Sequence, residues 1–376
     1  MRGSLRFLVA AAAACALLAA PAWGLVRFND GRDQVYVSAS YSWAYDSNIF
    51  AARDGGSDNV SSANLTVEYN RRAGLIGVNA TLAYDISRFQ QFSEENFANP
   101  SVGLEFTKGS GRTTGSLTLF GARSSRADPA TNQRTTSLNY NAGLFLKYPV
   151  IERYSLTGQF GYGKVRQIDN ASLVDLDTYN AGLDLFYVYT SERDLVGGYR
   201  VRVTDTSIDT KSYDHSWSLG VNGKLLPKLN GTLRSGYQVR STPGLAGSST
   251  HGLFLAGSSS WNFDARTSLT GQVSKDFSTT ATAVNIDSLT SSLDLQRTFN
   301  VHFTGGLNLG YGHIRFLGAL GDGRRDDYYT WGANINYTMR DYLKVMLTYT
   351  FFQNWSTLSF SDFTRRSLTV TVSSRF

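Results

Sequence analysis

The sequence of 376 residues has one cysteine, Cys15, and only six prolines. Cys15 lies in an N-terminal apolar run that follows Arg2 and Arg6 and ends near Ala22-Trp23-Gly24, which has small residues at the spacing that a signal peptidase recognises. We therefore predict a signal peptide over residues 1–24. A lipid anchor on Cys15 is disfavoured because the apolar run continues past it. Without cysteine, the mature chain has no disulfide, thiolate metal site or cysteine nucleophile.

Long apolar runs and a strong charge imbalance are also missing from the mature chain. No stretch approaches the roughly 20 residues that a membrane helix needs. Removal of Arg2 and Arg6 changes the count from 36 basic against 30 acidic residues to 34 against 30, a net charge of +4. This excess is too small to indicate a nucleic acid partner. Instead, the chain is rich in glycine, tyrosine, phenylalanine, serine, threonine and asparagine.

Apolar and polar residues alternate with a period of two along most of the chain. In one example, Val35, Val37, Ala39, Tyr41, Trp43 and Tyr45 alternate with Tyr36, Ser38, Ser40, Ser42 and Ala44. One face of such a strand suits lipid and the other suits water, and lipid cannot satisfy an open sheet edge. We predict an all-β fold over residues 25–376: a transmembrane, antiparallel, up-and-down β-barrel of about eighteen strands, with sixteen as the nearest alternative. Residues 25–34 form a short periplasmic lead. A soluble sandwich would favour valine and isoleucine, with closer turns.

Short and long connections alternate between these strands, and this predicts their orientation. The tight, charged connections are 71–74, 108–111, 191–194, 226–229 and 339–342, and we place them in the periplasm. The longer ones are 47–58, 90–99, 124–133, 169–175, 242–248, 316–325 and 354–362, and we place them outside. None is long enough to fold deeply into the lumen, and no plug is visible.

The last strand, from Leu368, ends at the aromatic residue Phe376. This ending resembles the C-terminal strand of bacterial outer-membrane β-barrels, whose terminal aromatic residue is read by the barrel-assembly machinery. It departs from the pattern at Ser374, where members more often have a large apolar residue. The resemblance implies location in the outer membrane, with lipid and the assembly machinery as partners.

A second resemblance lies in the segment from Asp46 through Asn48 to Phe50, after a tyrosine-rich strand, together with Asp85–Phe89. This segment is similar to a motif of EpsL-like barrels of exosortase systems and of the wider putative beta-barrel porin 2 group. The resemblance implies a conduit or accessory barrel for exopolysaccharide export, with polysaccharide and export components as partners. An Asx turn is the alternative explanation for Asp46 and Asn48.

Charges predicted to face the lumen fall unevenly along the chain. The acidic ones are Glu68, Asp85, Glu105, Asp184, Asp214, Asp276 and Asp294, and the basic ones include Arg200, Arg202, Lys224, Arg234 and Arg240 on three consecutive strands. Estimated registers place Arg200 opposite Ser218, Arg234 opposite Gly220, and Asp214 near Arg240. Arg200, Arg202 and Arg234 would form a basic wall with one acid close by, able to attract anionic solutes. Alternatively, the lumen charges neutralise one another.

Catalytic patterns are weak, and we expect no enzyme activity, no metal and no cofactor. His215 and His251 face outward, two strands apart, without the serine and amide partners of a barrel hydrolase, so an interfacial girdle is the better interpretation. No two histidines have metal-ligand spacing. Gly310-Tyr311-Gly312 lacks the lysine and helix of a phosphate loop, and its glycines would relieve crowding. The functional hypotheses are exopolysaccharide export, a general diffusion porin for small solutes, or a structural barrel with a blocked pore.

Overall fold

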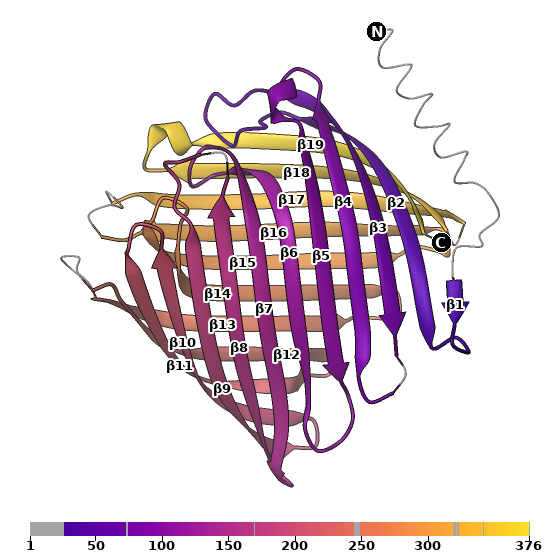
Figure 1. Ribbon diagram of the computed structural model, residues 1–376, viewed down its shortest axis with the longest axis vertical. Coiled ribbons are helices and arrows are strands. Elements are labelled where there is room, and N and C mark those ends of the chain that lie inside the picture. The colour runs from indigo at the N-terminus through magenta and orange to yellow at the C-terminus, as the bar shows by residue number, and fades with distance from the viewer. Residues whose placement is uncertain are drawn as a thin grey trace.

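The computed structural model describes residues 26–72, 74–168, 170–243, 249–318, 321, 323–340 and 342–375. The predicted signal peptide and the terminal Phe376 lie outside these residues. Eighteen antiparallel strands close into a single barrel, which confirms the predicted fold class and strand number. Figure 1 shows the strands as one continuous wall, in which each strand pairs with its neighbours in the sequence. Within the described residues, no helix combines the length and the apolar character that a bilayer-spanning helix requires.

The barrel strands are β2 Asp33–Asp46, β3 Asp58–Arg71, β4 Gly77–Phe89, β5 Phe97–Lys108, β6 Thr114–Asp128, β7 Gln133–Ile151, β8 Tyr154–Gln167, β9 Leu176–Thr190 and β10 Arg193–Thr206, followed by β11 Lys211–Leu226, β12 Leu229–Ser241, β13 Ser249–Asn262, β14 Thr267–Thr279, β15 Asn285–Thr298, β16 Phe303–Phe316, β17 Arg325–Arg340, β18 Leu343–Ser356 and β19 Phe363–Arg375. β19 pairs with β2 and closes the barrel, while the short strand β1 Val26–Phe28 pairs with β2. Two 3-10 turns, η1 Ser93–Glu95 and η3 Ser359–Ser361, lie in the longer loops.

Apolar side chains lie on the outside of the wall because directly paired residues share a face. Leu293 on β15 pairs with Leu309 on β16, which in turn pairs with Trp331 on β17, and all three are exposed on the exterior. The adjacent position Ser292 pairs with Gly310 on the inside. The predicted alternation therefore gives a lipid face and a lumen face.

The glycines Gly310 and Gly312 make room for side chains of the next strand. A Cβ atom on Gly312 would lie 2.1 Å from the Tyr328 ring, and one on Gly310 would lie 2.7 Å from Thr330 Cγ2. The crowding that the sequence suggested at these glycines therefore comes from β17. The absence of a side chain at Gly312 allows the Tyr328 ring to lie against the inner wall.

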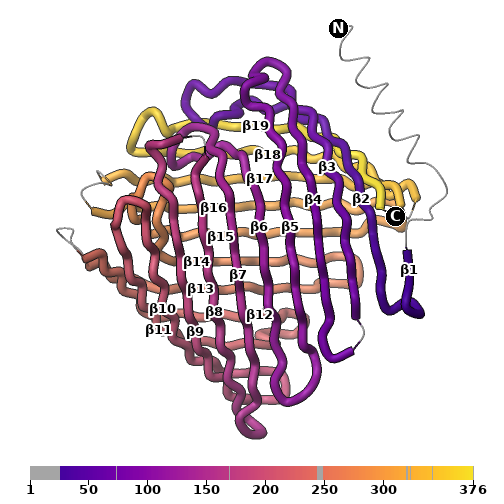
Figure 2. The backbone as a smooth tube through the Cα atoms, in the orientation of Figure 1, coloured from indigo at the N-terminus to yellow at the C-terminus, as the bar shows by residue number. Residues whose placement is uncertain are grey.

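The end of the barrel with the longer loops, which we call the outer end, is narrowed by contacts between loops. Arg324 Nη1 and Nη2 donate hydrogen bonds to the carbonyl oxygens of Ala130 and Pro129, at 3.0 and 3.1 Å, between the β16–β17 and β6–β7 connections. Val174 N donates to Ala281 O at 2.8 Å, between the β8–β9 and β14–β15 connections. In Figure 2, the loops at this end gather at the upper left. The mouth is therefore bridged from opposite walls.

Most of the buried apolar side chains also lie at this outer end, in the loops or at the strand ends beside them: Ile49, Ala51, Phe89, Leu173, Val174, Phe277, Ala283, Phe316 and Phe363. One of the outer loops is much shorter than the sequence suggested. The region 124–133, predicted as a loop, is mostly strand, because β6 runs to Asp128 and β7 begins at Gln133. This extended hairpin, rather than a long loop, reaches over the mouth.

A charge on the exterior face should cost far more stability than the same charge in the lumen. We expect Leu293→Arg to lower the free energy of unfolding in lipid bilayers by about 2–4 kcal/mol, because the guanidinium would enter the hydrocarbon core. The matched control is Ser292→Arg, one residue away on the lumen face, which should have a much smaller effect. Reversible urea unfolding in liposomes measures both. Equal losses would contradict the assigned faces.

Candidate functional site

Four arginines and three aspartates line one side of the lumen in a network of five residues and a separate pair, and we call the seven together the arginine cluster. Its members are Arg200 and Arg202 on β10, Arg234 and Arg240 on β12, Asp184 on β9, Asp214 on β11 and Asp276 on β14. All seven alternate with exterior residues of their strands and face inward. The cluster holds one more positive charge than negative charge.

The most buried ion pair of the cluster joins Arg240 and Asp214, which lie directly opposite each other on β12 and β11. Arg240 Nε and Nη2 donate to the two carboxylate oxygens of Asp214 at 2.6 and 2.7 Å. Only 2% of the Arg240 side chain and 7% of the Asp214 side chain is exposed. Removal of either partner would leave a buried, uncompensated charge, so this pair is structural.

Arg200 and Arg202 reach across the lumen to Asp276. Arg200 Nη2 lies 2.7 Å from Asp276 Oδ2, and Arg202 Nη1 lies 3.2 Å from the same oxygen. Three strands separate β10 from β14 in the wall, a path of about 19 Å at ~4.8 Å per strand. These short contacts therefore require the wall to turn sharply between β10 and β14.

The sequence predicted a basic wall with only one acid close to it, and the structure shows that this prediction is wrong. Asp214, Asp276 and Asp184 all lie within ion-pair distance of its arginines. The sequence placed these aspartates in the lumen but could not show that the turn of the wall brings β14 to β10. Charge neutralisation, the alternative interpretation, therefore holds for Arg202 and Arg240. Arg200 is 38% exposed and Arg234 is 21% exposed, and these two present guanidinium groups to the lumen.

The predicted registers are partly right. Arg234 pairs with Gly220 and Arg240 pairs with Asp214, as expected. Arg200 pairs with Ser216 instead of Ser218, because β10 and β11 are joined by a tighter turn than the predicted 207–212 loop. Lys224 is not in the cluster. It lies near the periplasmic end of β11 and pairs with Glu192 of the β9–β10 turn at 2.7 Å.

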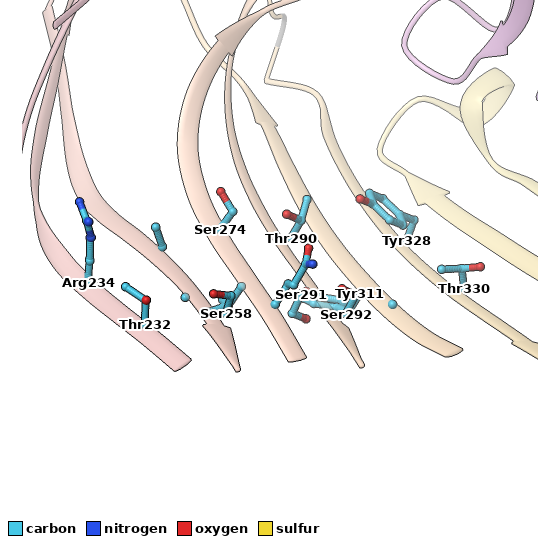
Figure 3. Close-up of a pocket in the computed structure, with 15 residues that line it drawn as sticks. Thr232, Arg234, Ser258, Ser274, Thr290, Ser291, Ser292, Tyr311, Tyr328 and Thr330 are labelled. Carbon is cyan, nitrogen blue, oxygen red and sulfur yellow. The ribbon is translucent and has the colours of Figure 1, made fainter. Parts of the chain in front are cut away.

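A polar depression of about 480 Å³ runs along the wall from Arg234 on β12 to Tyr328 and Thr330 on β17. Figure 3 shows Arg234 at one end and Tyr328 at the other, with hydroxyl side chains between them. The hydroxyls belong to Thr232, Ser258, Ser274, Thr290, Ser292 and Thr330. A hydroxyl can donate and accept a hydrogen bond, so the depression offers a solute polar partners at intervals along its length. Sequence analysis missed this feature because it spans six strands.

The segment from Asp46 to Phe50 supports the outer loops. Asp46 accepts a hydrogen bond from Asn48 N at 3.0 Å, which is the Asx turn considered above, and forms a two-pronged ion pair with Arg365 of β19. Asn48 is buried, and its side-chain amide donates a hydrogen bond to Ala52 O and accepts one from Ala52 N. The motif therefore shapes the first loop, and its polar groups are already used within the protein.

Residues beside the motif connect this loop to the extended β6–β7 hairpin. Asn132 Nδ2 donates to Ala51 O at 2.9 Å, and Arg134 Nη1 donates to Ile49 O at 3.3 Å. Phe50 contacts the edge of Phe92, with ring centroids 5.2 Å apart. The predicted motif residues thus fix the structure of the outer mouth and lie apart from the arginine cluster.

The histidines considered for catalysis lie in an exterior aromatic row. His215 Nδ1 lies 2.7 Å from the Tyr199 hydroxyl and its ring stacks on Trp217, while His251 stacks on Tyr237. Such a row is typical of a membrane interface. Among the residues that the structure describes, no three His, Cys, Asp or Glu side chains are placed to hold a metal ion.

Comparisons with known proteins agree with this architecture. Residues 215–376, less than half of the chain, match the model of the family described as Putative beta-barrel porin 2. The fold and this match define the chain as a bacterial outer-membrane β-barrel. They also support the predicted resemblance to the porin 2 group, whereas the resemblance to EpsL-like barrels stays a prediction. A search among curated proteins finds no match.

Solved structures with a similar fold include proteins of Pseudomonas aeruginosa and Acinetobacter baumannii. Pseudomonas aeruginosa OccK2 (OpdF) in complex with glucuronate is 11% identical, with a TM-score of 0.52 over 94% of this chain and 100% of that chain. Pseudomonas aeruginosa OpdK with vanillate is 12% identical, with a TM-score of 0.50 over 91% and 99%. Acinetobacter baumannii OccAB2 is 9% identical, with a TM-score of 0.51 over 92% and 98%. At these identities the likeness concerns the fold.

The predicted role in exopolysaccharide export is wrong. The structures that the chain resembles are Occ and Opd porins for small solutes, which match the alternative hypothesis of a diffusion porin. The prediction failed because it depended on the Asp46–Phe50 segment. In the structure, that segment serves the fold of the outer loops.

Loss of the Arg324 contacts should widen the outer mouth. Arg324 also pairs with buried Asp326 at 2.6 Å, so the test variant combines Arg324→Ala with Asp326→Asn to avoid an unpaired buried charge. We expect a higher single-channel conductance in planar bilayers. Arg53→Ala is the control, because no hydrogen bond or ion pair of the Arg53 side chain occurs among the described residues. Conductance equal to that of the wild type would show that these contacts do not limit the pore.

Removal of the Asp276 charge should make the pore more selective for anions. Asp276→Asn would leave Arg200 without its ion pair and Arg202 with only Asp214. The reversal potential in a potassium chloride gradient should shift towards the chloride potential. The control is Asp294→Asn, another lumen acid on the same wall but without an ion pair among the described residues. A shift of the same size in both variants would mean that the cluster has no special part in selectivity.

Proposed function

We propose that this barrel is an outer-membrane diffusion porin for small solutes that carry a carboxylate group. The observation that carries the proposal is the polar depression of about 480 Å³ that ends at Arg234. Arg234 Nη1 donates to Asp184 at 2.9 Å, and the other guanidinium donors are free of hydrogen bonds within the described residues. A guanidinium has five donors in a planar arrangement that fits a carboxylate.

Neighbouring groups support passage rather than tight retention of such a solute. Serine and threonine hydroxyls follow Arg234 along the wall, and Arg200 presents a second partly exposed guanidinium. Because Asp184 and Asp276 offset these charges, the attraction for an anion is moderate and a bound solute can leave. Glucuronate and vanillate, named with OccK2 and OpdK, are both carboxylates, which supports this solute class.

We propose that the barrel passes solutes without catalysing a reaction and without a cofactor. The outward histidines stack with aromatic rings and lie away from the polar depression, so they supply no acid or base to a solute there. Assembly through the terminal Phe376 by the barrel-assembly machinery stays a prediction from the sequence.

A structural barrel with a blocked pore is the second candidate. The bridging contacts at the outer mouth favour it, because they join opposite walls and bury apolar residues such as Leu173 and Val174. This candidate predicts no solute flux at all. The porin proposal predicts flux that depends on solute charge.

Uptake of a carboxylate should depend on Arg234. We expect Arg234→Gln to slow glucuronate entry severalfold in a liposome swelling assay and to leave glucose entry unchanged, because a charge-assisted hydrogen bond contributes about 1.5–3 kcal/mol. Lys224→Gln, which removes a lumen cation outside the cluster, is the control. Equal entry of glucuronate in wild type and Arg234→Gln would contradict the proposed solute class. No entry of either solute into wild-type liposomes would favour the blocked barrel.

A further inference from the structure

Charged side chains on the exterior of the barrel are distributed unequally between its two ends. At the outer end, the exterior positions of the described strands carry the basic residues Arg88, Arg123, Lys164, Arg166, Lys211, Lys275, Arg315, Arg325 and Arg366, and the acidic residues Asp177, Asp205, Asp287 and Asp327. At the periplasmic end they carry Asp33, Arg71, Lys108, Arg193, Arg297 and Arg340. The outer end therefore has a basic belt on its lipid-facing side, where a water-soluble substrate in the lumen cannot reach it.

On β14 to β17 the belt combines two paired cations with one unpaired cation. Asp287 accepts hydrogen bonds from Lys275 Nζ at 2.6 Å and from Arg315 Nη2 at 3.1 Å, so one carboxylate serves two cations. Arg315 lies directly opposite Arg325 on the next strand. The Arg325 side chain is exposed, and the described residues offer it no hydrogen bond or ion pair. Like charges directly opposite each other destabilise a sheet, and an anion between them would remove that cost.

The nearby acid Asp327 is already used by other groups. His313 Nδ1 lies 2.8 Å from Asp327 Oδ1, and the Tyr311 hydroxyl donates to the same oxygen at 2.9 Å. Asp327 therefore forms no ion pair with Arg325 among the described residues, although its charge lies on the same face. Lys275, Arg315 and Arg325 stand against the carboxylates of Asp287 and Asp327, so the site keeps one excess positive charge that can attract an external anion.

Below these cations, the same strands present apolar surface to the membrane. Leu293, Leu309 and Trp331 form one cross-strand row on the exterior of β15, β16 and β17. Their exposed fractions are 48%, 57% and 37%. A ligand that contacts both the cations and the apolar row has an anionic head and apolar chains that run along the wall.

We propose that Lys275, Arg315 and Arg325 bind the phosphate of an acylated lipid in the outer leaflet, with its chains along Leu293, Leu309 and Trp331. Arginine pairs with phosphate in a two-pronged geometry, and Arg315 and Arg325 project from directly paired positions on the same face. The outer leaflet of a bacterial outer membrane contains phosphorylated glycolipid, which supplies both the head and the chains. Free phosphate has the same head chemistry but no chains.

Native mass spectrometry of the delipidated, full-length mature barrel with added bisphosphorylated lipid A tests this site. We expect Arg315→Gln combined with Arg325→Gln to weaken lipid A binding at least about tenfold, the loss of one charge-assisted contact of ~1.4 kcal/mol or more. Arg193→Gln combined with Arg297→Gln is the matched control at the periplasmic end and should bind lipid A like the wild type. The single variant Arg325→Gln, which loses no contact within the protein, should change binding in the same direction as the double variant.

Two further measurements separate the possible sources of binding. Lipid A without phosphates should bind equally and weakly to the wild type and to the double variant. If the wild-type protein bound lipid A without phosphates as tightly as bisphosphorylated lipid A, the chains alone would account for binding and the proposal would be overturned. Displacement of lipid A by millimolar inorganic phosphate would identify a free-anion site and would also overturn it. So would unchanged lipid A binding in the Arg315 and Arg325 variants, or an equal loss in the periplasmic control.

Discussion

The whole structure depends on the backbone hydrogen bonds that join β19 to β2. These bonds run from Ser367 opposite Asp46 to Arg375 opposite Ser38 and leave the eighteen barrel strands without an open edge. Lipid offers no partners for backbone N–H and C=O groups, so the chain can occupy a membrane only in this closed form. Closure then assigns every second residue to the lumen. Large side chains in the lumen need small neighbours, and Gly312 makes room for the Tyr328 ring in this way.

The turn of the wall between β10 and β14 determines the electrostatics of the lumen. It brings Asp276 to Arg200 and Arg202, although three strands lie between them in the sheet. Ion pairs that bury both partners add little to stability, but they hold each charge in a fixed place. The attraction for a solute therefore depends on which guanidinium groups stay exposed, chiefly those of Arg200 and Arg234, and less on the number of cations in the sequence.

The period-two pattern was sufficient to predict the fold, the number of strands and the faces of Arg234, Arg240 and Asp214, because closure makes side-chain direction a matter of parity. It could not predict which strands approach each other across the lumen, so Asp276 was placed in the lumen without its partners. The Asp46–Phe50 segment misled the functional hypothesis for a related reason. A short polar motif has the same sequence whether its groups bind a ligand or, like Asn48, satisfy the backbone of their own loop.

The central claim is that solutes cross this barrel through a lumen whose exposed arginines favour anions. The reversal potential of the wild-type protein in a planar bilayer, with a gradient of potassium glucuronate, tests it most directly. The account predicts open channels and a reversal potential displaced towards the equilibrium potential of glucuronate. A reversal potential at the equilibrium potential of potassium, or a membrane that stays without channels, would contradict it.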